Sequence, residues 1–190
     1  MAFPAVKTLY TLDEYFALTD HETEIRYEYH FGKIVAMAGA KLRHNIIAGN
    51  VHGELRNNLK KRKCRPFNSD SRLRVSAQMW VYPDVMVSCH EEDLKAKLYL
   101  NHPSLIVEVL SDSTRRIDYS LKKQYYSQLP DLQYYIIIET EAVAVDVYER
   151  QGSSWVNTLY TEADAVIPLP LLDLELQMEE VYQWVDFEEE

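Results

Sequence analysis

The chain has 190 residues, a formal net charge of −10 and 47% hydrophobic residues. This length and balance exclude a disordered or fibrous chain, and they predict one globular domain over residues 1–190. The longest aliphatic stretches, such as residues 136–138, are far too short to span a bilayer, so we expect no membrane partner.

The two cysteines and the start of the chain bear on its compartment. Cys64 and Cys89 show neither metal-ligand spacing nor a disulfide framework, and we interpret them as isolated thiols. Residues 1–7 lack the long apolar stretch of a signal peptide. Together these features predict a reducing, cytoplasmic location.

The first half of the chain predicts a helix, a hairpin and a long second helix. Thr11 is a suitable N-cap, with Glu14 as its partner in a capping box. A hairpin is expected from residues 25–29 and 34–37. Apolar residues recur every fourth position over residues 42–59, which is typical of one buried helix face. These apolar residues are Ile47, Val51, Leu55 and Leu59.

The second half alternates strands with one more long helix. Strands are expected at 72–76, 80–88, 105–110, 133–139 and 143–148, with an edge strand at 155–160. Helices are expected at 118–128, before Pro130, and at 178–185. This order predicts an α/β fold in which a mixed β-sheet is flanked by α-helices on both faces.

Positive charge is concentrated in one third of the chain. Residues 41–74 hold ten of the twenty Lys and Arg residues but only two acids, a local net charge of +8. Such a stretch can contact phosphates on an acidic protein. A solvated helix end at residues 60–63 explains the same charges without a ligand. The candidate nucleic-acid-binding residues are Arg43, Lys60, Lys61, Arg62, Arg72 and Arg74.

Two carboxylates stand in apolar strand segments. Glu108 lies inside the nearly continuous apolar stretch 105–110, where an unpaired ionised group is costly, and Asp84 begins a second such stretch. Carboxylates on neighbouring strands can share a divalent cation, and Mg²⁺ suits such a site because it keeps waters and phosphate oxygens as ligands. Alternatively, each acid lies at a strand end, exposed or paired with an arginine.

Lys122 adds a cation to this pair. It is expected one turn into the helix that follows the Glu108 strand, fourteen residues further on. An ammonium beside a metal can stabilise charge on a phosphoryl group or orient the attacking water. A solvated lysine on the helix surface is the alternative, and Lys123 is a second candidate for the catalytic role.

An ordered series of motifs resembles a bacterial putative restriction endonuclease family of the PD-(D/E)XK nuclease superfamily. The motifs are Tyr82-Pro83-Asp84-Val85-Met86-Val87, Glu108-Val109-Leu110-Ser111-Asp112-Ser113-Thr114 and Asp118-x-x-x-Lys122-x-x-x-Tyr126. The stretch 26–35 and His44 also match the family pattern. The resemblance extends over nearly the whole chain and implies a restriction-endonuclease-like core.

The resemblance also implies roles for individual residues. Asp84, Glu108 and the carbonyl of Val109 would ligate Mg²⁺ or Mn²⁺, and Lys122 would be the catalytic lysine. In the standard superfamily pattern that lysine lies two residues after the acid, where this chain has Leu110. Further candidates are Glu28, as an additional acid near the metal, and His44, which matches a family position but for which the sequence indicates no role. Tyr126 is interpreted as a packing residue.

Three hypotheses follow. The first is a metal-dependent endonuclease that hydrolyses phosphodiester bonds, most simply in DNA and as a homodimer, since two strands require two sites. The second is a nuclease-fold protein that binds nucleic acid or a protein partner without cutting. The third is an interaction protein whose paired acids are structural. Loss of metal-dependent cleavage when Asp84 is replaced separates the first from the others.

Overall fold

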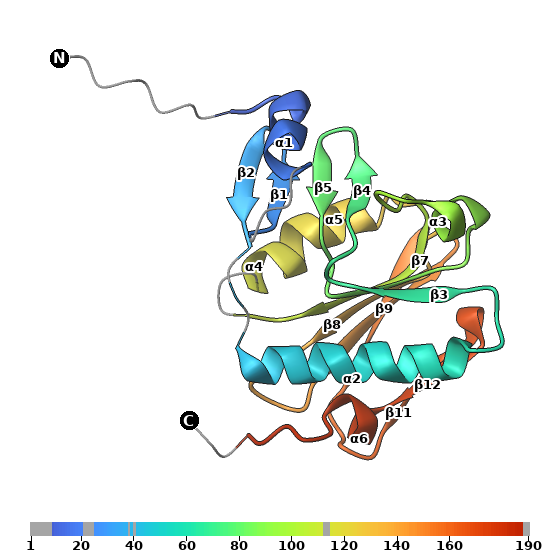
Figure 1. The fold of residues 1–190 in the computed structure, drawn as a ribbon. Coiled ribbons are helices and arrows are strands. Elements are labelled where there is room, and N and C mark those ends of the chain that lie inside the picture. Colours follow the sequence, from blue (N-terminus) through green and yellow to red (C-terminus); the bar gives the residue numbers. More distant parts are fainter. Residues whose placement is uncertain (1–8, 21–24, 38, 40, 112–114, 188–190) are drawn as a thin grey trace.

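The computed structural model describes residues 9–20, 25–37, 39, 41–111 and 115–187 (Figure 1). The start of the chain and the motif residues Asp112, Ser113 and Thr114 lie outside this part. Every helix within it is too short or too polar to span a bilayer.

A mixed six-stranded sheet forms the centre of the fold. Its order is β10-β9-β8-β7-β6-β3, in which β7 and β8 are parallel and every other neighbouring pair is antiparallel. The strands are β3 (Arg65–Asn68), β6 (Val85–Ser88), β7 (Pro103–Val109), β8 (Tyr134–Ile138), β9 (Val145–Gln151) and β10 (Ser154–Tyr160). β10 lies at the edge, as the sequence predicts.

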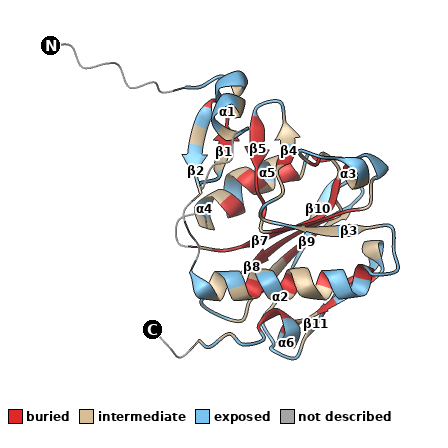
Figure 2. Ribbon diagram, viewed as in Figure 1, coloured by how far each residue is buried: buried red, intermediate tan, exposed pale blue. Residues whose placement is uncertain are grey.

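Helices cover both faces of this sheet, which confirms the predicted α/β fold. Helix α2 (Leu42–Leu59) packs its apolar stripe against one face of the sheet (Figure 2). Val107 and Val109 of β7 belong to the same hydrophobic core as this stripe. The other face is covered by one helical segment, in which Tyr126 packs against Ile106 and Tyr135. That segment consists of α4 (Arg115–Ile117), the π-helical stretch η1 (Asp118–Lys122) and α5 (Lys123–Tyr126).

A second, four-stranded sheet stands beside the first, with order β2-β1-β5-β4. It contains β1 (Tyr27–His30), β2 (Lys33–Ala36), β4 (Leu73–Ser76) and β5 (Met79–Val81). Helix α1 (Leu12–Thr19) covers it, begins at Thr11 and carries the predicted capping box with Glu14. The hairpin turn uses Gly32 at a φ of 86°, where a side chain would be strained.

The segment predicted as one strand over residues 80–88 is two strands in two different sheets. β5 ends at Val81 and β6 begins at Val85. Pro83 lies between them, and a proline offers no N–H to a sheet ladder. The break carries the chain from the small sheet to the large one and leaves Asp84 at the junction.

The end of the chain contains elements that the sequence did not predict. β11 (Val166–Leu169) and β12 (Leu174–Gln177) pair around the 3₁₀ turn η2 (Pro170–Leu172). The terminal helix α6 (Met178–Val181) is shorter than predicted. This hairpin contributes Ile167 and Leu176 to the core beneath α2. A short helix, α3 (Glu91–Lys95), was also missed.

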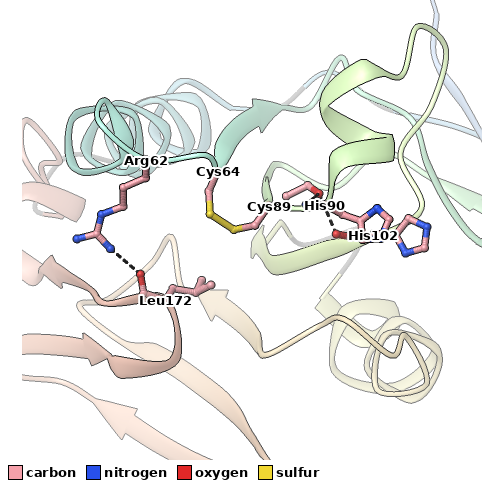
Figure 3. The surroundings of a disulfide bond; sticks show 7 residues. Arg62, Cys64, Cys89, His90, His102 and Leu172 are labelled. Carbon is pink, nitrogen blue, oxygen red and sulfur yellow. Dashed lines mark hydrogen bonds between the residues drawn. A yellow bond between two sulfur atoms is a disulfide. The ribbon is translucent and has the colours of Figure 1, made fainter.

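Cys64 and Cys89 form a disulfide, so the interpretation as isolated thiols was wrong (Figure 3). The reason is β3, which the sequence did not reveal as a strand. Its first residue, Arg65, pairs with Ser88 of β6. Because the two strands are antiparallel, Cys64, which precedes Arg65, lies opposite Cys89, which follows Ser88. The bond removes one premise of the cytoplasmic assignment, which stays a prediction.

The disulfide should contribute measurably to stability. It joins residues 25 positions apart, and closing a loop of this size in the unfolded chain corresponds to about 3 kcal/mol. We expect Cys64→Ser/Cys89→Ser, or reduction of the wild type, to lower the free energy of unfolding by this amount in urea titrations. A wild type that labels at both cysteines without reductant would contradict the bond.

Candidate active site

Glu108 and Lys122 meet in the interior although they lie on different elements. Side chains alternate along β7, so Glu108 shares the face of Ile106 and points at the η1–α5 segment. Lys122 and Tyr126 are one turn apart on that segment. The Lys122 ammonium lies 3.0 Å from Glu108 Oε1, and the Tyr126 hydroxyl donates to the same oxygen at 2.8 Å.

Two further carboxylates hold the lysine. Glu28 arrives from β1 of the small sheet, with its Oε1 3.5 Å from the Lys122 nitrogen, and Asp118, one turn earlier on η1, lies 3.3 Å away. Glu28, Glu108, Asp118 and Lys122 are each at most 7% exposed. Asp118 begins one of the family motifs, but no role was predicted for it from the sequence. The i, i+4, i+8 spacing with Lys122 and Tyr126 was the available signal.

Asp84 and His44 form the more exposed side of the site. The Val109 N–H donates to Asp84 Oδ2 at 2.8 Å, which ties the β5–β6 junction to the end of β7. His44, in the first turn of α2, places Nε2 3.3 Å from the same oxygen. Each of these two side chains keeps 12% exposure. Val109 therefore reaches the site through its N–H, and its carbonyl as a metal ligand stays a proposal.

The carboxylates outnumber the cation at the centre of the site. Burial raises the pKa of Glu108 well above its usual value, and Asp118, Asp84 and Glu28 add to this rise, whereas Lys122 opposes it. Burial lowers the pKa of Lys122, but the carboxylates of Glu108 and Glu28 outweigh it and raise that pKa well above its usual value. Negative charge is thus in excess around a single ammonium.

This donor set fits a divalent cation. Within the described residues, no hydrogen-bond donor contacts Asp84 Oδ1 or Glu108 Oε2, so each acid keeps one oxygen for a ligand. A cation beside both would relieve their mutual repulsion. Within the described part of the chain, three His, Cys, Asp or Glu ligand atoms lie within 4.8 Å of one another at a different place, formed by His90, Glu92 and His102.

The family model described as Uma2, putative restriction endonuclease, matches residues 12–179. The chain belongs to this Uma2 family. Two uncharacterized Synechocystis proteins are 30% identical over 177 residues and 32% identical over 162 residues. The first match covers 92% of both chains, and the second covers 83% of this chain and 91% of its relative.

A solved structure has the same fold. It is the crystal structure of a putative nuclease belonging to DUF820 from Anabaena variabilis, with a TM-score of 0.75 and 23% identity. The match covers 93% of this chain and 99% of that one. A restriction-endonuclease-like core with a mixed sheet is therefore confirmed for this Uma2 chain.

Three of the candidate nucleic-acid-binding arginines already contact other groups of the protein. Arg72 donates to the Tyr82 hydroxyl at 2.7 Å and stacks over Tyr15. Arg62 donates to the Leu172 carbonyl at 2.8 Å (Figure 3). Arg43 donates to the Thr140 carbonyl and pairs with Glu141 at 3.0 Å. These contacts leave Arg43, Arg62 and Arg72 less available to phosphates.

The other basic candidates are exposed. Lys60 and Lys61 follow the end of α2, and Arg74 lies on β4 with its guanidinium 5.8 Å from the Trp80 ring centre. Helix α2 carries His44 in its first turn and these lysines after its last. His44 and Lys60 are sixteen residues apart along the helix, which separates the two positions by about 24 Å, or about seven base pairs of duplex.

Glu28 has a strongly perturbed ionisation that links the site to stability. Burial raises its pKa, but Lys122, His30 and the Tyr82 N–H favour the charged form, and the pKa falls from 4.5 to about 2. His30 Nε2 lies 2.8 Å from Glu28 Oε2. Because the folded pKa is depressed, this stabilisation is complete above pH 4.5 and is lost as the pH falls towards 2.

Replacement of Glu28 should therefore destabilise the protein in a pH-dependent way. We expect Glu28→Gln to lower the free energy of unfolding in chelator at pH 7 by about 3 kcal/mol, and the difference from wild type to shrink below pH 4.5. Glu141→Gln, which removes a half-exposed carboxylate, is the control and should cost under about 1 kcal/mol. A pH-independent difference in urea titrations would show that the Glu28 charge is not its cause.

Proposed function

We propose that this Uma2 protein is a metal-dependent endonuclease that hydrolyses phosphodiester bonds in DNA. Asp84, Glu108 and the Val109 carbonyl would hold Mg²⁺ or Mn²⁺. The observation that carries the proposal is the Lys122 ammonium, 3.0 Å from Glu108 Oε1. Leu110 stands where a lysine two residues after the acid would be, and Lys122 supplies the cation from the facing helical segment instead.

The chain's own residues divide the work. When bound, the cation would lower the pKa of a coordinated water and neutralise charge on the phosphoryl oxygens. The Lys122 ammonium, which faces three carboxylates, would exchange one of these contacts for a hydrogen bond to the attacking water or to a phosphate oxygen. The water oxygen would bond to phosphorus and release its proton to solvent while the opposite P–O bond breaks, and the leaving oxygen would take a proton from solvent.

The surrounding contacts keep these groups in place. Tyr126 orients Glu108 through the hydroxyl bond of 2.8 Å, and Asp118 and Glu28 hold the lysine. His44 and the Val109 N–H share Asp84 Oδ2, which leaves Oδ1 to face a ligand. The substrate would approach from the side of Asp84 and His44, since the other groups are almost completely buried.

DNA binding would depend mainly on backbone phosphates. Lys60, Lys61 and Arg74 are exposed and provide contacts that read no sequence. Affinity should therefore fall steeply with salt. Because both strands of a duplex need a site, the proposal includes a homodimer, which sedimentation of the protein with and without duplex would detect.

A second candidate is a nuclease-fold binding module that does not cut. It is favoured by Leu110 at the standard lysine position and by the net charge of −10. Both candidates predict DNA binding, so cleavage separates them.

The test follows plasmid relaxation in Mg²⁺, Mn²⁺ and chelator, with duplex, single-stranded DNA and RNA as competing substrates and binding measured in parallel. Nicking of the DNA substrates that requires Mg²⁺ or Mn²⁺ and stops on chelation supports the proposal. Salt-dependent DNA binding with intact substrate in both metals identifies the binding module. Cleavage of RNA alone overturns the assignment of DNA.

A further inference from the structure

Three metal-ligating side chains gather at the opposite end of the sheet from Glu108. His90 follows β6, Glu92 lies in the first turn of α3, and His102 precedes β7. Their ligand atoms all lie within 4.8 Å of one another. The two imidazole rings are stacked, with centroids 4.0 Å apart and an interplanar angle of 21° (Figure 3). None of these residues has a part in the nuclease proposal.

Buried polar groups fix the backbone around both histidines. Ser88 is fully buried, and its hydroxyl accepts from the His90 N–H at 3.2 Å and donates to the His102 carbonyl at 2.9 Å. Asp93 is 2% exposed and accepts the N–H groups of Asn101 and His102, both at 2.9 Å. The backbone that carries the two imidazoles is thus fixed before any ligand binds.

The ring of His102 is oriented in the manner of a metal ligand. Its Nδ1 lies 2.7 Å from Asp131 Oδ2, and its Nε2 points towards Glu92, 3.5 Å from Oε2. Metal-ligating histidines commonly give their second ring nitrogen to a carboxylate, which fixes the tautomer and leaves the other nitrogen's lone pair for the ion. The Glu92 side chain is 74% exposed and can adjust to the ion.

We propose that His90, Glu92 and His102 bind a transition-metal ion of the Zn²⁺ class, with Asp131 as the positioning residue for His102. Two imidazoles and one carboxylate suit Zn²⁺, Co²⁺ or Ni²⁺, whereas Mg²⁺ prefers oxygen ligands. Three protein ligands leave a coordination position open. A cavity of about 450 Å³, lined by His90, His102 and Asp131 among others, adjoins the site and has room for a water or small anion there.

This site is distinct from the proposed nuclease site. β6 and β7 are antiparallel, so residues that follow β6 lie beside residues that precede β7, while Asp84 and Glu108 lie at the other ends of the same strands. Six residues separate Asp84 from His90, which puts the sites up to about 20 Å apart.

The ion would cross-link two connections of the fold. His90 lies in the β6–α3 connection, Glu92 lies in the first turn of α3, and His102 lies in the segment before β7. The Cys64–Cys89 disulfide already ties β3 to β6 one residue from His90 (Figure 3). Metal and disulfide would together fasten this end of the sheet.

Zinc binding by the untagged full chain tests the proposal. We expect wild type to retain one Zn²⁺ per chain after dialysis, to give a tetrahedral Co²⁺ absorption spectrum, and to rise in Tm with Zn²⁺. His90→Ala/His102→Ala should weaken Zn²⁺ affinity by more than about 100-fold and Asp131→Asn by about 10- to 100-fold. Glu91→Gln, on the same helix but outside the cluster, should bind like wild type.

Two further variants keep the test decisive. Glu92→Gln removes one ligand from an exposed side chain, so its loss of affinity is not a consequence of misfolding. Asp84→Asn/Glu108→Gln should leave Zn²⁺ binding unchanged, whatever happens to cleavage. The proposal is overturned if wild type binds no more Zn²⁺ than the His90/His102 double variant, or if binding disappears with Asp84 and Glu108.

Discussion

Asp84→Asn/Glu108→Gln should lose metal-dependent plasmid cleavage by at least about 10³-fold, since the metal's charge stabilisation is worth several kcal/mol. The amides keep the shape of both side chains and can still accept from the Val109 N–H and the Tyr126 hydroxyl. They remove the two charges that would bind the cation. Metal-supported nicking rates, compared at saturating Mg²⁺ and Mn²⁺, give the measurement.

The matched control is Asp146→Asn. Asp146 is also a sheet carboxylate, on β9, but it accepts from the Tyr119 hydroxyl at 2.7 Å and takes no part in the proposed site. Its cleavage rate should equal that of wild type. If the double variant cut as fast as this control, Asp84 and Glu108 would not be metal ligands for cleavage.

Lys122→Met should reduce cleavage by about 10²- to 10³-fold, the usual effect of removing one preorganised donor. It should also lower the free energy of unfolding by about 3–5 kcal/mol, because Glu108, Glu28 and Asp118 would lose the ammonium that they share in the interior. Cleavage is therefore measured well below the variant's Tm, and stability is measured by urea titration in chelator.

Lys123→Met decides between Lys122 and Lys123, the two candidates for the catalytic lysine. The Lys123 nitrogen lies 3.8 Å from the centre of the Tyr148 ring, away from the carboxylates. We expect this variant to cut like wild type and to lose about 1 kcal/mol of stability at most. Cleavage lost in Lys123→Met and kept in Lys122→Met would reverse the assignment.

The elements that the sequence predicted well are those whose packing follows from local periodicity. The four-residue spacing from Ile47 to Leu59 marks one helix face whatever lies opposite it, and α2 has the predicted bounds. The apolar stretch 105–110 similarly required a strand covered on both sides, and β7 is fully buried. Thr11 and Glu14 determine a helix start between themselves.

Short elements held by distant partners were not visible in the sequence. β3 has only four residues and owes its place to β6, so its pairing and the disulfide beside it appear only in the tertiary structure. The π-helical stretch within the predicted helix 118–128 and the β11–β12 hairpin also carry no local signature that we recognised. Tertiary packing decides β3 because its pairing partners in β6 lie 17 to 23 residues further along the chain.

The candidate site divides in the same way. The sequence by itself determined that Asp84 and Glu108 stand beside apolar strands and that Lys122 lies on the following helical segment, since these are properties of neighbouring residues. Only the tertiary structure decided that Glu28 crosses from the second sheet to Lys122, that Asp118 joins it, and that Arg72 is engaged inside the protein. Spacing along a chain limits which side chains share an element, whereas the fold alone determines which charges are buried together.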